Sequence, residues 1–158
     1  MRIGVISDTH GDIVSAEKAI KAMGDVDLLL HAGDTYRDAE LLKEMLNIDV
    51  IAVKGNTDFD YEADLERIIS IDEKQIFLAH GHQYNVKYGL DRLYYKALET
   101  ESDIVVFGHS HMPLHVEEKG IVFVNPGSVS RPRGGSRHSY ATINIEVDNI
   151  HVELLAFE

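Results

Sequence analysis

Cysteine is absent from the chain, positive charge is scarce, and no apolar run is long. The absence of cysteine excludes disulfide bonds and metal sites built on thiolates. No apolar stretch approaches the ~20 residues of a membrane-spanning helix, so no membrane segment is expected. The first apolar run begins within two residues of the N-terminus, which argues against a signal peptide and favours a cytoplasmic location.

The charge balance is strongly acidic, with 27 Asp and Glu against 15 Lys and Arg and a formal net charge of −12. This field opposes binding to a nucleic acid polymer or to an anionic membrane, but it tolerates bound cations. With 158 residues, 44% of them hydrophobic, the chain has the size and core content of a single domain spanning residues 1–158. The sequence is compatible with a homo-oligomer of such domains.

Five short apolar runs each stop at residues that can bind metal. The runs cover residues 3–7, 28–32, 50–53, 76–79 and 104–107, and their composition predicts buried strands. Open α/β sheets bind ligands at the carboxyl ends of their strands. The residues that follow these runs are therefore expected along one sheet edge: Asp8, His10, Asp34, Asn56, His80, His109 and His111.

The order of the predicted elements indicates an α/β fold with two facing sheets flanked by helices. Helices expected at 12–23 and 37–46 alternate with the first three strands, which predicts a parallel sheet with right-handed crossovers. Residues 57–67 are expected to form a short helix or a loop. The second half is expected to contain a hairpin (66–71 and 75–79), a helix (87–99), a strand (104–107) and late strands at 114–118, 120–124, 139–145 and 150–155.

The candidate ligands mix imidazole nitrogen with carboxylate oxygen, which suits Mn, Fe, Co, Ni or Zn rather than Mg or Ca. Seven side chains are too many for one ion, and they can fill two sites only if one carboxylate bridges. Asp34, alone in its loop, is the predicted bridge. Helix capping could explain Asp8 or Asp34, and a turn could explain Asn56, but neither explains the joint pattern.

These motifs, in their order along the chain, resemble those of the calcineurin-like metallophosphoesterases. They are Asp8-Thr9-His10, Gly33-Asp34, Gly55-Asn56-Thr57-Asp58, His80-Gly81-His82 and Gly108-His109-Ser110-His111. The match is best with the small single-domain phosphodiesterases of that superfamily, and Asn125-Pro126-Gly127-Ser128 extends it over most of the chain. The resemblance implies a four-layer α/β/β/α sandwich of two facing mixed sheets flanked by helices.

The resemblance also implies residue roles and a reaction. One ion would be held by Asp8, His10, Asp34 and His111, and the other by Asp34, Asn56, His80 and His109. A hydroxide bridging two divalent ions, with manganese the first choice and Ni, Zn, Fe or Co as alternatives, would attack phosphorus in line with the leaving oxygen. The implied function is hydrolysis of a small phosphodiester. The alternatives are a phosphomonoesterase or nucleotide phosphatase, or a binding scaffold like the retromer subunit of this superfamily, with a vestigial metal site.

One motif departs from the family pattern. Thr57 stands where the larger family carries a histidine that protonates the leaving group, and a hydroxyl is a poor general acid near neutral pH. His82 is a candidate for that catalytic role, because in an extended segment it would point to the same side as His80. A loop histidine without function is the alternative reading of His82. Without such an acid, the enzyme would prefer leaving groups that need little help.

The glycine-rich loop of residues 125–137 is unusually basic for this acidic chain. Arginine can bind phosphate through two parallel hydrogen bonds, so Arg131 and Arg133 are interpreted as a site for substrate phosphate. A solvated surface loop is the alternative. His31, inside an apolar run, is expected to be buried and hydrogen-bonded.

Overall fold

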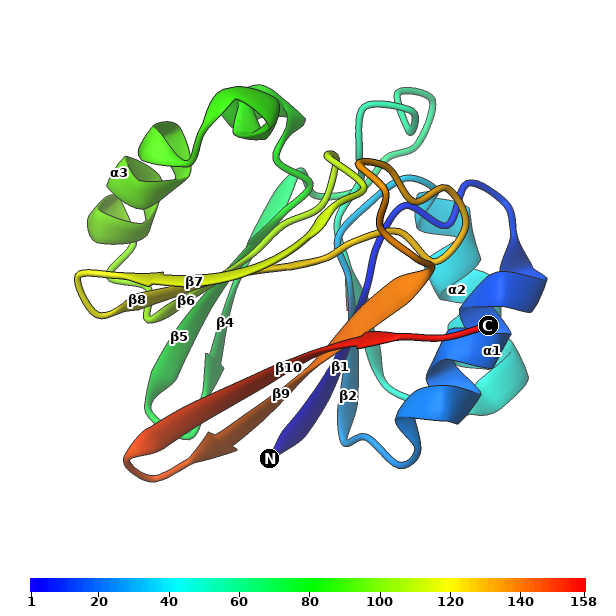
Figure 1. The fold of residues 1–158 in the computed structure, drawn as a ribbon, viewed down its shortest axis with the longest axis horizontal. Helices are drawn as coiled ribbons and strands as arrows, with labels where there is room; N and C mark the ends of the chain where they lie inside the picture. Colours follow the sequence, from blue (N-terminus) through cyan, green and yellow to red (C-terminus); the bar gives the residue numbers. More distant parts are fainter.

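The computed structural model describes residues 1–158 and contains two five-stranded sheets and three α-helices (Figure 1). In the first sheet the strand order is β10-β9-β1-β2-β3, with β1, β2 and β3 parallel and β9 antiparallel to its two neighbours. Its strands are β1 (Arg2–Ile6), β2 (Leu28–His31), β3 (Val50–Ala52), β9 (Ser139–Glu146) and β10 (Asn149–Ala156). The predicted alternation of strands and helices is confirmed, with α1 at Ile13–Met23 and α2 at Tyr36–Leu46.

The second sheet has the order β4-β5-β6-β8-β7 and is also mixed. The pairs β5–β6 and β6–β8 are parallel, whereas β4 and β7 run antiparallel at the two edges. Its strands are β4 (Glu66–Ile71), β5 (Lys74–Ala79), β6 (Ile104–Val106), β7 (Pro113–Glu118) and β8 (Ile121–Pro126). The third helix, α3 (Asp91–Glu99), lies between β5 and β6 in the chain and covers the outer face of this sheet.

Three buried clusters show how the layers stack. The largest, of 17 residues, lies between the sheets and combines residues such as Ile3 and Val5 with Ile76 and Leu78. A second cluster packs α1 and α2 on the outer face of the first sheet, and a third packs α3 on the second. Each fully buried Leu, Ile or Phe side chain contributes about 1.5–3 kcal/mol relative to exposure. The layers are therefore α/β/β/α, as predicted.

Several expected boundaries shift for local reasons. The helix expected from residue 87 begins at Asp91, because Gly89 has a φ of 138° and separates it from a single 3₁₀ turn at Val86–Tyr88. Residues 57–65 form turns and no helix. The start of α1 follows capping chemistry, since the Asp12 side chain accepts a hydrogen bond from the Ser15 amide at 3.0 Å.

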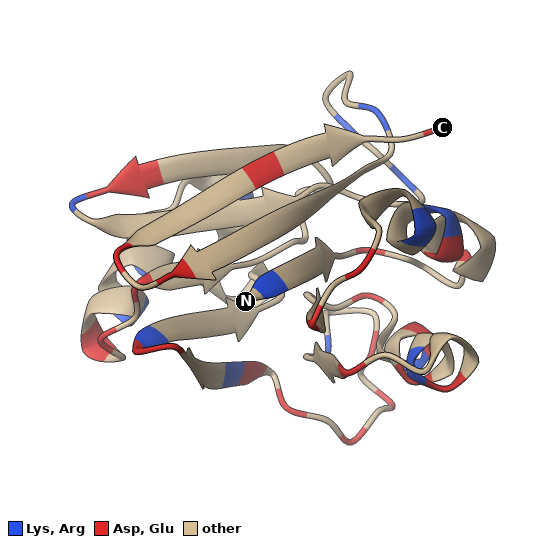
Figure 2. Ribbon diagram, turned by 90° about the horizontal axis from the view of Figure 1, so that it is seen from below, with Lys and Arg blue, Asp and Glu red and all other residues tan.

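None of the helices is long and apolar enough to cross a bilayer. Figure 2 shows acidic residues scattered over turns, strand ends and helices, whereas the loop next to the C-terminus carries basic residues. That loop follows β8 and contains Arg131, Arg133 and Arg137. The excess of negative charge is thus spread over the surface, while three of the fifteen basic residues lie in one loop.

Candidate metal centre

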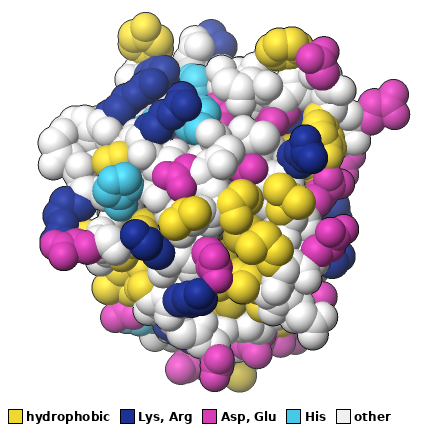
Figure 3. Space-filling view, turned by 90° about the vertical axis from the view of Figure 1, so that its right-hand side faces the viewer, with side chains coloured by type: hydrophobic (Ala, Val, Ile, Leu, Met, Phe, Trp, Pro, Cys, Tyr) yellow, Lys and Arg dark blue, Asp and Glu magenta, His cyan; other side chains and the backbone are white.

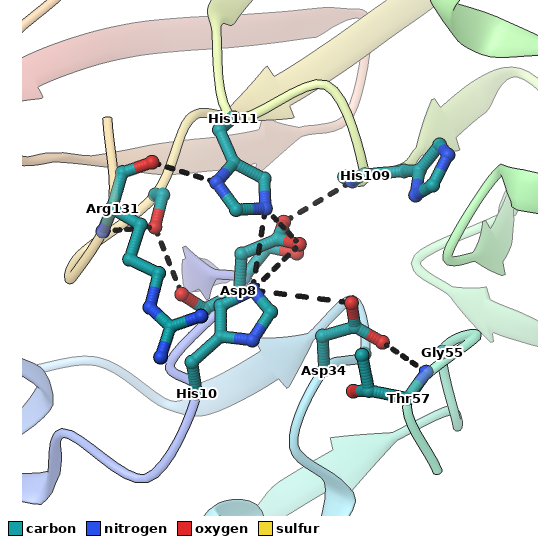
Figure 4. Close-up of polar contacts among 12 residues, drawn as sticks. Asp8, His10, Asp34, Gly55, Thr57, His109, His111 and Arg131 are labelled. Atoms are coloured by element: carbon teal, nitrogen blue, oxygen red, sulfur yellow. Dashed lines mark hydrogen bonds and ion pairs between the residues drawn. The ribbon is translucent and has the colours of Figure 1, made fainter. Parts of the chain in front are cut away.

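The residues that follow the parallel strands of both sheets meet at one edge of the sandwich, at the top of Figure 1. The first sheet contributes the segments after β1, β2 and β3, and the second contributes those after β5 and β6. The structure brings together all seven residues that the sequence singled out. Figure 4 shows the side chains of Asp8, His10, Asp34 and His111 close together, with the backbone amide of His109 directed at Asp8.

One group of contacts surrounds Asp8. Its Oδ1 atom lies 3.0 Å from Nε2 of His111 and 3.8 Å from Nε2 of His10. The two imidazole Nε2 atoms are themselves 3.2 Å apart. These three side chains place their donor atoms within 4.8 Å of one another, which is close enough to bind one ion.

A second group surrounds His80. Its Nε2 atom lies 3.3 Å from Asp34 Oδ2, 3.1 Å from Asn56 Oδ1 and 3.2 Å from Nδ1 of His109. Asp34 Oδ2 is also 3.9 Å from His10 Nε2, so this carboxylate reaches both groups, as a bridge must. Asp8 Oδ1 does so as well, at 3.8 Å from His80 Nε2. Both carboxylates therefore lie between the two groups of histidines.

Two histidine rings are oriented by backbone carbonyls. Nδ1 of His80 donates to the Ala32 carbonyl at 2.7 Å, and Nδ1 of His111 donates to the Arg131 carbonyl at 2.6 Å. A carbonyl can only accept, so Nδ1 carries the proton and Nε2 keeps its lone pair for the centre. His10 and His109 lack such an anchor, since their rings make hydrogen-bond contacts only with His111 and His80.

Five of the seven candidate ligands have left-handed backbone conformations, which non-glycine residues rarely adopt. They are Asp8, His10, Asp34, His109 and His111, with φ between 47° and 68°. The end of β8 and the loop after it support this geometry. The hydroxyls of Ser128 and Ser130 both donate to the Asp8 carbonyl at 2.8 Å, and Nδ2 of Asn125 donates to the Gly108 carbonyl at 3.0 Å. This part of the chain thus holds the segments after β1 and β6 together.

Glycine is required next to two ligands because the ligands pack against it. A Cβ atom on Gly55 would lie 1.9 Å from Asp34 Oδ1, and one on Gly108 would lie 2.1 Å from the Ser7 hydroxyl and 2.7 Å from Asp8 Oδ2. Neither glycine has a positive φ, so a larger residue is excluded by steric overlap and not by backbone conformation. The glycines of these motifs let the carboxylates approach the neighbouring loops.

The electrostatics of the centre favour bound cations. Burial raises the pKa of Asp8, but contacts with His10 and His111 lower it by more than burial raises it. The net pKa of Asp8 is therefore well below its usual value. Burial likewise raises the pKa of Asp34, and its contact with His80 brings it down to about 2. Both carboxylates are buried, and neither has a lysine or arginine partner.

Asp8 Oδ1 supplies a direct test of the fit to metal. It is buried and has no hydrogen-bond partner, while its other oxygen accepts from the Ser7 hydroxyl at 2.6 Å and the His109 amide at 3.1 Å. An unpartnered buried carboxylate oxygen is costly unless a cation compensates it. Imidazole nitrogens and carboxylate oxygens around it form a donor set suited to a divalent transition metal.

Asp58 has a structural role in this chain. Its Oδ2 accepts from the amides of Asp34 at 3.2 Å and Gly55 at 2.8 Å, and its Oδ1 accepts from the amide of Tyr36 at 2.9 Å. It thereby ties the loop after β2 to the loop after β3. The neighbouring Thr57 amide donates to Asp34 Oδ1 at 3.1 Å, which fixes that carboxylate from the same loop.

The segment at His82 is not extended, so the condition under which it was predicted to point to the side of His80 is not met. Gly81 has a φ of 105°, and His82–Tyr84 form a 3₁₀ turn. The turn still carries the His82 ring toward the centre, with ring centroids 5.5 Å from His80 and 6.2 Å from His109. Burial, and next to it the nearby His80, lowers the pKa of His82.

The arginine loop meets the centre through its backbone and leaves two guanidinium groups free. The Arg131 carbonyl orients His111, and the Arg133 amide donates to the His111 carbonyl at 3.1 Å. Both side chains are exposed and form no ion pair, whereas Arg137 pairs with Glu158 at 3.2 Å. In Figure 4 the Arg131 side chain points to the side of His10, and Figure 3 shows basic side chains beside a histidine on the face that carries α1 and α2.

His31 is fully buried and hydrogen-bonded, as predicted. Its Nδ1 accepts from the Gly33 amide at 3.1 Å, and its Nε2 lies 3.1 Å from the Thr9 hydroxyl. Burial lowers the pKa of His31 to about 4, so the ring is neutral near pH 7. Sequence reasoning did not identify Asp38, which also contacts Thr9, because an acidic residue in the first turn of a helix is common and gives no sign of burial.

Comparison with known proteins places these features in a wider group. Residues 1–148 match the calcineurin-like phosphoesterase superfamily domain. The chain is 34% identical over 152 residues to the probable metallophosphoesterase YsnB of Bacillus subtilis, covering 94% of this chain and 86% of YsnB. It is 30% identical over 174 residues to the phosphodiesterase YfcE of Escherichia coli, covering 93% and 89% of the two chains.

A solved structure agrees with these sequence relationships. The crystal structure of a predicted phosphoesterase from Streptococcus pneumoniae superposes with a TM-score of 0.85 at 33% identity, covering 98% of this chain and 88% of that one. The similarity therefore extends over both sheets and over all the segments that form the centre.

Proposed function

The chain belongs to the calcineurin-like phosphoesterase superfamily of metal-dependent phosphoester hydrolases, and on this premise we propose that it hydrolyses a small phosphodiester with two divalent transition-metal ions, Mn²⁺ being the first choice. The observation that carries the proposal is the buried, unpartnered Asp8 Oδ1 among histidine nitrogens and a second buried carboxylate. The name of the relative YfcE supports a diester as substrate.

The proposed ligand sets follow the two groups of contacts. Asp8, His10 and His111 would hold one ion, Asn56, His80 and His109 would hold the other, and Asp34 would serve both. Two such ions, when bound, activate a water molecule as nucleophile and neutralise charge on the phosphoryl group. The asparagine contributes a neutral oxygen, which limits the negative charge that the protein itself brings to the phosphate.

The chain's own residues would position the substrate in this scheme. Arg131 and Arg133 have unpaired guanidinium groups at the rim of the centre and would bind a nonbridging phosphate oxygen. Thr57 offers no effective acid to the leaving oxygen, and the Asp58 carboxylate already accepts three amides. We therefore propose that diesters with good leaving groups are hydrolysed fastest. The alternative is that the nearby His82 donates the proton, which would remove that preference.

The test uses the metal-free full chain, reconstituted separately with Mn²⁺, Ni²⁺, Zn²⁺, Fe²⁺ and Co²⁺. Metal content per chain is measured first, and hydrolysis of bis(p-nitrophenyl) phosphate is then compared with that of p-nitrophenyl phosphate. The expected result is two ions per chain and faster turnover of the diester. Faster turnover of the monoester would favour a phosphomonoesterase, and two bound ions without any turnover would favour a binding scaffold. Binding of at most one ion would contradict the two-metal proposal.

A further inference from the structure

Beneath the candidate centre lies a buried polar network that joins a strand, a loop and a helix. It consists of His31 at the end of β2, Thr9 in the loop after β1, and Asp38 in the first turn of α2. The exposed fractions of these residues are 0%, 0% and 3%, and their side chains form no hydrogen bond with the side chain of a candidate ligand. We call them the His31–Thr9–Asp38 network.

The hydrogen bonds of this network have a defined direction. The Gly33 amide donates to His31 Nδ1, so the ring proton sits on Nε2 and is donated to the Thr9 hydroxyl at 3.1 Å. The Thr9 hydroxyl in turn donates to Asp38 Oδ2 at 2.5 Å and accepts weakly from the Thr35 amide at 3.3 Å. Asp38 Oδ2 also accepts from the Gly11 amide at 2.8 Å. Every polar side-chain atom of Thr9 and His31 therefore has a partner within the protein.

These contacts involve the residues directly before and after His10 in the sequence. Thr9 and Gly11 are its two neighbours, and both are bound to the same carboxylate oxygen of Asp38. His10 itself has a left-handed φ of 47°, and its ring has no carbonyl or carboxylate anchor of the kind that orients His80 and His111. The His10 ring contacts only other residues of the centre, so outside the centre its position is set through its backbone.

We propose that the His31–Thr9–Asp38 network is a positioning device for His10. It fixes the left-handed turn at His10 relative to the loop that carries Asp34, because His31 and Thr9 also bind the amides on either side of Asp34. This inference rests on the proposed function, since it assigns the network to the ion held by Asp8, His10, Asp34 and His111. The residues act through His10 and do not touch substrate.

The decisive variants remove one hydroxyl or one carboxylate. Thr9→Val keeps the shape of the side chain but cannot donate or accept, and Asp38→Ala removes the acceptor for both neighbours of His10. Each is titrated with Mn²⁺ after metal removal, and hydrolysis of bis(p-nitrophenyl) phosphate is measured. The expected result is a roughly 10- to 100-fold weaker affinity for one of the two ions, which is the usual effect of removing a group that orients a ligand. kcat should fall at a fixed Mn²⁺ concentration, with little change in KM.

Three controls separate positioning from general stability. Thr9→Ser restores the hydroxyl and should restore Mn²⁺ affinity. Thr142→Val removes another buried threonine hydroxyl, in β9 and at 3.5 Å from its Glu153 partner, and should leave both ions unchanged. In a His10→Ala background Thr9→Val should add no further loss, whereas in a His109→Ala background it should weaken the remaining ion as in the wild type.

The outcomes are distinguishable. If the unmodified chain binds no Mn²⁺ and hydrolyses no ester, the proposed function fails first. If it binds two ions and Thr9→Val binds both with unchanged affinity, the positioning proposal fails alone. Equal weakening of both ions in every background would mean a general structural effect and would also overturn it. If Thr9→Val does not fold, Asp38→Ala decides by the same criteria, and if neither folds, the network is a folding element and the proposal is wrong.

Discussion

Two histidines, one from each half of the centre, are held in different ways. His80 lies directly after β5, has an ordinary backbone conformation, and is fixed through its ring by the Ala32 carbonyl. His10 lies in a left-handed turn, and its ring has no comparable anchor. A histidine can thus be oriented through its ring or through its backbone, and the second way needs a supporting network around the neighbouring residues.

This difference has a consequence for stability. Removing the His80 ring leaves a buried carbonyl without a donor, whereas removing the His10 ring leaves no backbone group unpaired. Loss of either imidazole should damage the centre, but only one loss should also weaken the fold. Substitutions at the two histidines can test that contrast.

We expect His80→Ala, His10→Ala and Asn56→Ala each to abolish hydrolysis of a diester, because each removes a proposed ligand and the mechanism needs both ions. Only His80→Ala should also reduce the free energy of unfolding, by about 1–3 kcal/mol, since the Ala32 carbonyl loses its donor. Turnover at saturating Mn²⁺ and urea unfolding of the metal-free chains measure the two effects. Near-normal turnover in any of the three would remove that residue from the ligand set.

The glycines provide a test in both halves at once. Gly55→Ala should displace Asp34 and Gly108→Ala should displace Asp8, because the added methyl group would overlap the carboxylate or its serine partner. The expected loss in Mn²⁺ affinity is roughly 10- to 100-fold in each, as for other changes that disturb ligand orientation. Calorimetric titration checks this. Unchanged affinity in Gly55→Ala would show that the loop after β3 can move away without cost.

A smaller effect is expected at the rim. Arg131→Ala should lower kcat/KM by roughly ten- to hundredfold, the value of a charge-assisted hydrogen bond of about 1.5–3 kcal/mol. Arg133→Ala should have less effect, because the Arg131 side chain is the one that lies beside His10. Metal content should not change, and Arg137→Ala serves as the control, since Arg137 already pairs with Glu158. If both Arg131→Ala and Arg133→Ala stay within twofold of the wild type, this loop is a solvated surface.

The smallest effect is expected from Thr57→His. A positioned general acid contributes about 100-fold or more, but the new imidazole would lack an orienting carboxylate, because Asp58 already accepts three amides. The rate should therefore depend steeply on the pKa of the leaving group in both the variant and the wild type. A series of aryl phosphodiesters measures this dependence. A flat dependence in the wild type, with chemistry rate-limiting, would indicate that His82 or another group already donates the proton.

Much of this arrangement could be predicted because it depends on short-range patterns. The apolar runs identified the strands, and the rule that ligands gather at the carboxyl ends of parallel strands brought Asp8, Asp34 and His80 to one edge. The two facing sheets and the element order were also predicted correctly. These features follow from periodicity and from the position of glycine and polar residues, which a single sequence shows directly.

The supporting contacts could not be predicted, because they depend on which loops meet in space. Asp38 has the sequence appearance of an ordinary residue in the first turn of a helix, and its burial follows only from the packing of α2 against the loop after β1. The hydroxyls of Ser128 and Ser130 meet the Asp8 carbonyl across a sequence separation of about 120 residues. The turn at His82 depended on one positive φ at Gly81, which periodicity does not reveal.

The division of the ligands between the two sheets has a mechanical meaning. Asp8, His10, Asp34 and Asn56 belong to the first sheet, and His80, His109 and His111 belong to the second. Each proposed ion would therefore be a cross-link between the two sheets at one end of the sandwich. Ions that bind only the docked layers oppose their separation in proportion to the logarithm of free metal concentration. Metal occupancy would thus report on the docking of the sheets, and a chelator would loosen the sandwich from its catalytic end.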